Sequence, residues 1–265
     1  MRVKINTKKK KIVFITGTRA DFGKIKSLIE VLCREKKFEV HVFATGMHMS
    51  SRYGMTVQEI YKCGFKNIFE YRNGVHKGKH APHVLSSTIS GFDKYIKKLK
   101  PDLIVVHGDR VEALAGALVG SLNNILVGHV EGGEVSGTID DHIRHSLSKL
   151  SNLHFVANEK ARKRLIQMGE SESDIFVIGS PDLDIMLSDN LPTIEEVKEH
   201  YEIPYDKYAV VLYHPVFTEY HLIKEQTKIL VDALILSKSN YVVIYPNNDL
   251  GSEIILDIYK KKLSN

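Results

Sequence analysis

The stretch from Gly128 to Ser146, GHVEGGEVSGTIDDHIRHS, carries more reactive side chains than packing requires. Its reactive residues are four carboxylates, three histidines and one arginine, namely Glu131, Glu134, Asp140, Asp141, His129, His142, His145 and Arg144. Crowded carboxylates and imidazoles can hold groups whose pKa values are pushed apart, and proton transfer at carbon requires such groups. The sequence therefore predicts acid–base chemistry in this segment.

The segment follows an apolar run, 125–127, that is typical of a strand buried on both faces. Further buried strands are predicted at 11–16, 39–44 and 102–107. Strands and helices alternate, which indicates a parallel sheet with helices on both faces, and such sheets bind ligands at the carboxyl ends of their strands. We predict a Rossmann-like α/β domain over residues 1–184.

A second strand–helix series occupies residues 185–265. A linking helix precedes two predicted strands, at 208–213 and 241–245, each followed by a polar loop and a helix. Two strands are too few for a finished sheet domain. We therefore predict a second Rossmann-like domain that is incomplete in this chain.

Composition excludes several classes of protein. The chain has 265 residues, 43% of them hydrophobic and 26% charged, as in soluble globular proteins. Its net charge is +5, but the basic residues are dispersed, so no nucleic-acid interface is predicted. No apolar run is long enough for a membrane span or a signal peptide, and we expect a cytoplasmic protein. The two cysteines lack metal-ligand spacing, and no histidine pair lies at ligand spacing from a carboxylate, so no metal site is predicted.

Five motifs together resemble a known family. They are TGTRADFGK, HGDRVEALA, HVEGGEVSGTIDDHIRHSLSKL, the YHPV around His214, and YPNNDLGS. They resemble the hydrolysing UDP-N-acetylglucosamine 2-epimerases, including the epimerase half of the bifunctional 2-epimerase/N-acetylmannosamine kinase of sialic acid synthesis. The resemblance runs from about Lys11 to the end of the chain. It implies two Rossmann-like domains as in the B-type glycosyltransferases, a UDP-sugar bound in the cleft between them, no cofactor, and a homo-oligomer, either dimer or tetramer.

The implied reaction converts UDP-GlcNAc and water into N-acetylmannosamine and UDP. UDP is eliminated to leave a 2-acetamidoglucal, to which water then adds, in the biosynthesis of sialic-acid-type sugars. Four alternatives stay open: the same chemistry on a UDP-diacetamido-trideoxyhexose for legionaminic acid, a non-hydrolysing epimerase, a glycosyltransferase of the same architecture, and a non-catalytic UDP-sugar-binding fragment.

The resemblance also implies site residues. The expected catalytic residues are Asp109, Glu131, Asp140 and His214, with the identity of the base at C2 left open. The expected substrate-binding residues are Arg19, Gly23, Lys24, His48, Arg110, Glu134, Asp141 and Asn247. The residues by themselves allow other roles. Asp109 suits the N-cap of a helix that begins at Val111, Asp140 and Asp141 suit a first helical turn, and Arg110 suits a salt bridge within its helix. His107 and His129 adjoin buried strands and are expected to be core histidines.

Overall fold

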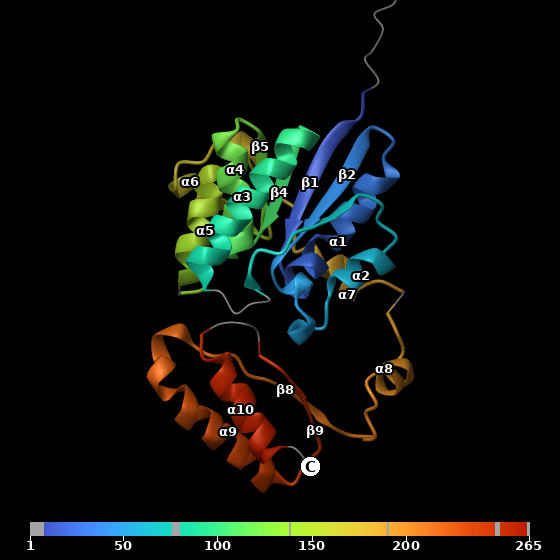
Figure 1. Cartoon of the computed structure of the whole chain (residues 1–265), viewed down its shortest axis with the longest axis vertical. Coiled ribbons are helices and arrows are strands. Elements are labelled where there is room, and N and C mark those ends of the chain that lie inside the picture. The colour runs from blue at the N-terminus through green and yellow to red at the C-terminus, as the bar shows by residue number, and fades with distance from the viewer. Residues whose placement is uncertain (1–7, 76–79, 138, 190, 247–249, 264–265) are drawn as a thin grey trace, which may run out of the picture. The chain divides into compact units, whose positions relative to one another are not determined.

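A computed structural model covers the chain and describes residues 8–75, 80–137, 139–189, 191–246 and 250–263 (Figure 1). The chain divides into two compact units, residues 1–189 (unit 1) and 190–265 (unit 2). None of the helices in the described ranges has a stretch long and apolar enough to cross a membrane.

Unit 1 is built on a parallel seven-stranded sheet with the strand order β3-β2-β1-β4-β5-β6-β7. Its strands are β1 (Lys10–Thr16), β2 (Phe38–Ala44), β3 (Ile68–Glu70), β4 (Leu103–His107), β5 (Leu126–Val130), β6 (Leu153–Val156) and β7 (Ile175–Val177). Its α-helices are α1 (Arg19–Arg34), α2 (Val57–Lys62), α3 (Ala81–Leu99), α4 (Val111–Leu122), α5 (Ile139–Leu150), α6 (Glu159–Gln167) and α7 (Asp182–Met186).

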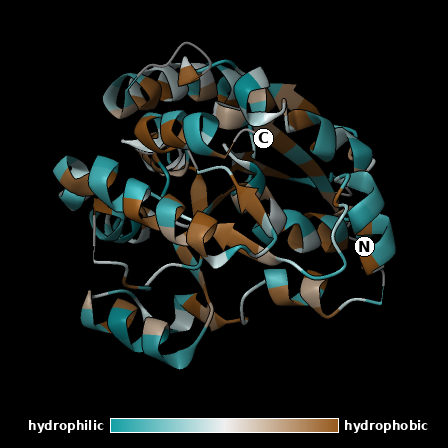
Figure 2. Cartoon of the chain, turned by 90° about the horizontal axis from the view of Figure 1, so that it is seen from below, coloured by the Kyte–Doolittle hydropathy of each residue, from teal (hydrophilic) through white to brown (hydrophobic). Residues whose placement is uncertain are grey.

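The central strands are apolar because both of their faces are covered. Ile12 and Phe14 of β1 pack into one core with α1 and α2, whereas Val13 and Ile15 pack into another with α3, α4 and α5. Figure 1 shows α3, α4 and α5 together on one side of the sheet, and Figure 2 shows how strongly hydrophobic the strands are. The predicted α/β fold, a parallel sheet with helices on both faces, is confirmed.

The strand order reverses between β1 and β4. From β1 the chain builds outward to β2 and β3, and it then returns to place β4 on the other side of β1. The crossovers after β1 and β4 lead to opposite faces of the sheet, and the carboxyl ends of the strands at such a switch point are the usual ligand position in open α/β sheets. The topology thus places the loops after β1, β4 and β5 at one edge of the sheet.

The first loop is shorter than the sequence predicts. The sequence indicates a loop over residues 17–24, but α1 already begins at Arg19. The cause is a capping box, in which the Thr18 hydroxyl accepts from Asp21 N at 3.2 Å and the Asp21 carboxylate accepts from Thr18 N at 3.0 Å. Lys24 consequently lies on the second turn of a helix, which fixes its direction.

Helix α4 lies close to the sheet because its inner face has small residues. A Cβ atom on Gly116 would lie 2.9 Å from Ile15 Cγ2, and one on Gly120 would overlap with Val127 Cγ2. The Ala- and Gly-rich sequence of the helix allows this close approach. The close approach of α4 determines where the loop before it, residues 108–110, ends.

Unit 2 contains one small parallel sheet. Its elements are α8 (Ile194–His200), β8 (Ala209–Leu212), a 3-10 helix (Phe217–Leu222), α9 (Ile223–Ser237), β9 (Tyr241–Ile244) and α10 (Ser252–Lys262). Ile223 and Val231 of α9 pack against Ile255 and Tyr259 of α10 in its core. In contrast to the strands of unit 1, β8 is largely exposed, with Val210 58% accessible.

We expect Gly120→Ala to destabilise the protein by about 1–3 kcal/mol, because the added methyl group meets two buried side chains that have no room to move. Gly23→Ala in α1 is the matched control, since nothing lies within 4 Å of the position that its methyl group would take. The control is expected to gain about 0.5–1 kcal/mol from the higher helix propensity of alanine. Urea unfolding of both variants measures the difference, and equal stabilities would contradict the packing described for α4.

Candidate active site

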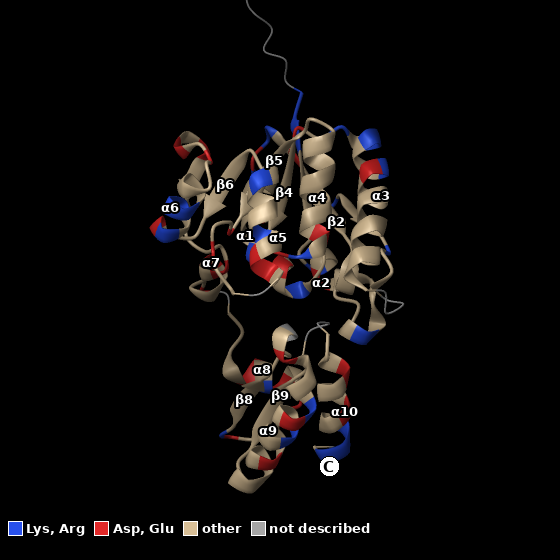
Figure 3. Cartoon of the chain, turned by 90° about the vertical axis from the view of Figure 1, so that its left-hand side faces the viewer, with Lys and Arg blue, Asp and Glu red and all other residues tan. Residues whose placement is uncertain are grey.

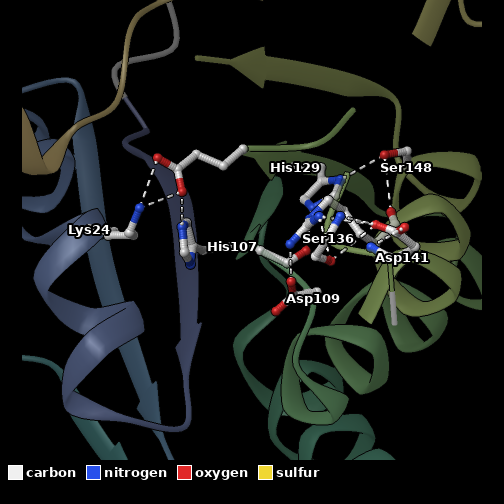
Figure 4. Close-up of polar contacts among 11 residues, drawn as sticks. Lys24, His107, Asp109, His129, Ser136, Asp141 and Ser148 are labelled. Carbon is white, nitrogen blue, oxygen red and sulfur yellow. Dashed lines mark hydrogen bonds and ion pairs between the residues drawn. The ribbon is translucent and has the colours of Figure 1, made fainter. Parts of the chain in front are cut away.

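Side chains from three other segments of unit 1 converge on the carboxylate of Glu131, which follows β5. Lys24 Nζ lies 2.9 Å from Oε2 and 3.2 Å from Oε1, and His107 Nε2 lies 2.9 Å from Oε2. The Ser180 hydroxyl, which follows β7, also donates to this carboxylate. Figure 4 shows Lys24 and His107 pointing toward the carboxylate from α1 and β4. An ionised carboxylate only accepts hydrogen bonds, so His107 carries its proton on Nε2.

The backbone of Glu131 is in the left-handed region, with φ at 59°. A residue with a side chain adopts this conformation at a cost of order 1 kcal/mol, and such residues concentrate at functional sites. The conformation turns the chain sharply as it leaves β5. Two glycines then follow. A Cβ atom on Gly132 would lie 2.7 Å from His129 Nδ1, and one on Gly133 would lie 2.6 Å from Ala161 O.

The Glu131 carboxylate is held in its ionised form. Burial alone would raise the pKa of Glu131, but the hydrogen bonds from His107, Ser180 and Lys24 outweigh that effect and hold the pKa well below its ordinary value. Burial would lower the pKa of Lys24, but Glu131, together with Asp182 at 3.4 Å, raises it overall. Both members of this ion pair therefore stay charged at neutral pH.

Asp109 has the opposite electrostatic character. Its side chain is 26% exposed and is hydrogen-bonded to Arg144 of α5. Burial raises the pKa of Asp109, the nearby charge of Asp140 raises it further, and Arg144 offsets only part of the rise. Two carboxylates whose pKa values move apart are typical of a site with separate acid–base roles.

The N-cap role considered for Asp109 is not what the structure shows. Arg110 occupies the N-cap position of α4, and no side chain caps that helix end. Arg144, which binds Asp109, was part of the reactive stretch but not of the predicted site. Ser180 was missed as well, because only folding brings the end of β7 beside the end of β5. His107, predicted as a core residue, is only 8% exposed yet contacts Glu131 directly.

Asp140 and Asp141 begin α5, where acidic residues gather (Figure 3). Asp141 accepts from the backbone N–H groups of Ser136 at 2.6 Å and Gly137 at 2.7 Å, and these bonds lower its pKa. Asp141 therefore holds the loop between β5 and α5 in shape. Asp140 is partly buried and close enough to Asp109 to influence its pKa.

Two histidines are structural supports of the site. His129 is fully buried, with Nε2 2.8 Å from Gly108 O and Nδ1 3.1 Å from Ser148 Oγ, as expected for a core histidine. Burial lowers the pKa of His129 to about 3, so the ring is neutral and donates through Nε2. His48 is also fully buried, with its ring nitrogens 3.0 Å from Thr16 Oγ1 and 2.8 Å from Thr56 Oγ1. Its contact with a sugar stays a prediction.

The remaining predicted site residues have diverse settings. Arg19 is exposed at the start of α1, and Gly23 lies one turn further along the same helix. Arg110 Nε lies 3.6 Å from Glu112 Oε2, the salt bridge considered from sequence. Glu134 accepts from Asn158 Nδ2 at 2.9 Å.

Two further predicted residues belong to unit 2. His214 follows β8 and is exposed, whereas Asn247 is outside the described residues. Within the described ranges no group of His, Cys, Asp and Glu side chains is arranged to hold a metal ion.

The fold and this site define an α/β protein with a cluster of carboxylates and cations at the carboxyl ends of a parallel sheet. The family model described as UDP-N-acetylglucosamine 2-epimerase matches residues 30–265. The chain therefore belongs to the UDP-N-acetylglucosamine 2-epimerase family.

Several relatives support this assignment. The chain is 49% identical over 247 residues to a UDP-N-acetylglucosamine 2-epimerase of Neisseria meningitidis, covering 93% of this chain and 65% of the relative. It is 34% identical to the hydrolyzing UDP-N,N'-diacetylbacillosamine 2-epimerase of Legionella pneumophila, covering 95% and 68%. It is 32% identical to the polysialic acid biosynthesis protein P7 of Escherichia coli, covering 93% and 64%. The chain thus spans about two thirds of the length of these relatives.

Solved structures agree in fold. A UDP-GlcNAc 2-epimerase from Neisseria meningitidis, bound to UDP-GlcNAc, superposes with a TM-score of 0.77 at 20% identity, covering 95% of this chain and 70% of that one. The UDP complex of Staphylococcus aureus MnaA gives a TM-score of 0.75 at 23% identity, covering 97% and 67%. At these identities the likeness concerns the fold alone.

We expect acid to destabilise the protein partly through His129. Its pKa in the folded state, about 3, is below the ordinary value of 6.5, so below pH 6.5 the unfolded chain binds more protons than the folded one. As the pH falls below 6.5, His129 should therefore lower the free energy of unfolding by up to about 1.4 kcal/mol for each pH unit. His129→Asn should flatten the pH dependence of urea unfolding between pH 6.5 and 4.5. The exposed His142→Asn is the control, and an unchanged slope in His129→Asn would contradict the assignment.

Proposed function

We propose that the protein is a hydrolysing UDP-N-acetylglucosamine 2-epimerase that converts UDP-GlcNAc and water into N-acetylmannosamine and UDP. Family membership supports an epimerase of nucleotide sugars. The hydrolytic form is supported by the relatives of Legionella pneumophila and Campylobacter jejuni, whose names specify a hydrolyzing epimerase. The likeness to a polysialic acid biosynthesis protein supports a place in the synthesis of sialic-acid-type sugars.

The observation that carries the proposal is that Asp109 and Glu131, carboxylates at the ends of neighbouring strands, have opposite pKa shifts. Each contacts its own cation, Arg144 for Asp109 and Lys24 for Glu131. The proton on C2 of an N-acetyl sugar is weakly acidic, so its removal is feasible when the bond between C1 and the diphosphate oxygen breaks in the same event. The electron pair of the C2–H bond forms the double bond of the glycal, and UDP leaves with the electrons of the C1–O bond. Water then adds across this double bond. Its hydroxyl group is added to C1, and C2 receives a proton on the face opposite to the one from which the first proton was removed.

The environment of each carboxylate suggests its part. Three donors stabilise Glu131 as an anion, which makes it a weak base. Its hydrogen bonds hold Lys24 and His107 in place. Asp109 binds a proton more readily, because its pKa is raised, so it is the better group to take up and return protons. We assign the proton transfers to Asp109, assisted by the neighbouring Asp140, and the electrostatic support to Glu131.

The leaving diphosphate needs cations. Arg19 and Arg110 are assigned to it because a guanidinium group matches two phosphate oxygens at once. Lys24, Gly23, His48, Glu134 and Asp141 complete the proposed substrate-binding set in unit 1. His214, as a catalytic residue, and Asn247, on the nucleotide side, are assigned from the motifs of unit 2. The proposed protein acts in the cytoplasm as a homo-oligomer, without a metal or cofactor.

A second candidate substrate is a UDP-diacetamido-trideoxyhexose. It is favoured by the likeness to epimerases of N,N'-diacetylbacillosamine nucleotides from Legionella pneumophila, at 34% identity, and Campylobacter jejuni, at 32%. The two sugars differ at C4 and C6, whereas the epimerised carbon and the diphosphate are the same. The acid–base residues are therefore common to both candidates, and only a comparison of the two substrates separates them.

The proposal predicts that the full-length protein in D2O releases UDP together with N-acetylmannosamine deuterated at C2, as followed by NMR. Asp109→Asn should lower kcat by about 10²–10⁴-fold, because it removes the proton carrier. Asp93→Asn on α3, a partly exposed carboxylate paired with Lys97, is the control and should keep full activity.

Other products would point elsewhere. Release of UDP-N-acetylmannosamine would identify a non-hydrolysing epimerase, and turnover of the diacetamido sugar alone would select the second substrate. Transfer of the sugar to an acceptor would indicate a glycosyltransferase. If the protein binds UDP but turns over none of these substrates, it would be a non-catalytic UDP-sugar-binding protein.

A further inference from the structure

Glu112, on the first turn of α4, is a buried carboxylate that the proposed chemistry does not use. Its side chain is 1% exposed, and neither oxygen accepts a hydrogen bond from any residue in the described ranges. The one charge paired with it there is Arg110, whose Nε lies 3.6 Å from Glu112 Oε2. A buried carboxylate that lacks hydrogen bonds costs several kcal/mol, so its presence needs a reason other than stability.

The segments that contact Glu112 lie at the carboxyl ends of the strands, where a ligand is expected. A Cβ atom on Gly17, directly after β1, would lie 2.8 Å from Glu112 Cδ. One on Gly46, in the loop after β2, would lie 2.6 Å from Glu112 Oε1. The backbones of both loops therefore close over the carboxylate, and glycine is needed in each for lack of space. Three loops, after β1, β2 and β4, meet at this one side chain.

The position of the Glu112 carboxylate beside Arg110 affects how the Arg110 side chain is oriented. The Arg110 side chain is 25% exposed although its Nε is buried, whereas the side chain of its partner Glu112 is 1% exposed. An arginine side chain has many rotamers, and its fork recognises a diphosphate only when its plane is correctly turned. A buried negative charge beside Nε restricts that rotation and fixes the plane of the guanidinium group.

We propose that Glu112 is a positioning residue that orients Arg110 toward the diphosphate of the nucleotide sugar. This inference rests on the proposed function, because it takes a nucleoside diphosphate group as the ligand. Gly17 and Gly46 belong to the same arrangement, since a side chain at either position would displace the carboxylate. The sequence allows Arg110 either a salt bridge or a diphosphate contact. In this arrangement the salt bridge with Glu112 orients Arg110 for the diphosphate contact.

Binding of UDP to the full-length protein, measured by calorimetry, tests this role independently of turnover. Glu112→Gln keeps the shape of the side chain and removes its charge. It should raise the Kd for UDP about ten-fold, because a misoriented Arg110 would lose about one charged hydrogen bond to the diphosphate. Glu112→Asp keeps the charge on a shorter arm, and it should raise the Kd by less. Glu30→Gln at the surface of α1, where the partner is Lys26 at 3.8 Å, is the control and should bind UDP like the wild type.

A double-mutant cycle separates positioning from general support of the fold. Arg110→Ala should weaken UDP binding, and Glu112→Gln should have no further effect in that background. The melting temperature of Glu112→Gln should equal or exceed that of the wild type, because an unsatisfied buried charge has been removed.

Three outcomes would overturn the inference. The first is wild-type affinity in both Glu112 variants. The second is weakening by Glu112→Gln that persists undiminished in the Arg110→Ala background. The third is failure of the wild type to bind UDP, which would overturn the proposed function as well, whereas the first two concern Glu112 alone.

Discussion

The site of unit 1 depends on one ionised carboxylate held between charged and polar donors. Glu131 leaves β5 in a left-handed conformation and receives Lys24 from α1, His107 from β4 and Ser180 from the segment after β7. Since these donors come from different strand–helix units, the contact fixes the relative positions of the loops at the carboxyl edge of the sheet. Removal of the carboxylate would leave Lys24 and Asp182 as a more weakly anchored pair and would free His107 to rotate.

The supporting residues have a common physical property: they are neutral or fully paired. His129 is buried and neutral, which joins the loop after β4 to α5 without adding a charge to the site. Asp141 is satisfied by backbone N–H groups of its own loop. Asp109 differs, because burial, together with the charge of Asp140, outweighs the nearby positive charges and raises its pKa. Asp109 thus differs from Glu131 and Asp141, whose pKa values the fold lowers.

Glu112 differs from these residues, because it is a buried carboxylate whose oxygens accept no hydrogen bond within the described ranges. Glu112 lies beside Arg110, and His129 contacts Gly108 O, so a buried side chain contacts each of these two residues of the loop after β4. Both supports rely on glycine, at Gly17 and Gly46 for Glu112 and at Gly132 for His129, because the backbone approaches these side chains too closely for a Cβ atom. Gly17 and Gly132, which belong to the sequence motifs, thus mark close packing behind the site.

The layered α/β fold follows from local sequence patterns, because apolar runs of strand length that alternate with amphipathic helices can be buried only as a parallel sheet covered on both faces. The same patterns locate the carboxylates, since Asp109 and Glu131 directly follow buried strands. Which groups meet depends on the folded chain. The contacts of Glu131 with Ser180 and of Asp109 with Arg144 join residues 49 and 35 positions apart, and no local pattern encodes such pairs. Likewise, opposite pKa shifts arise from burial and neighbours in space, so two carboxylates that look equivalent in sequence acquire different chemistry only when the chain folds.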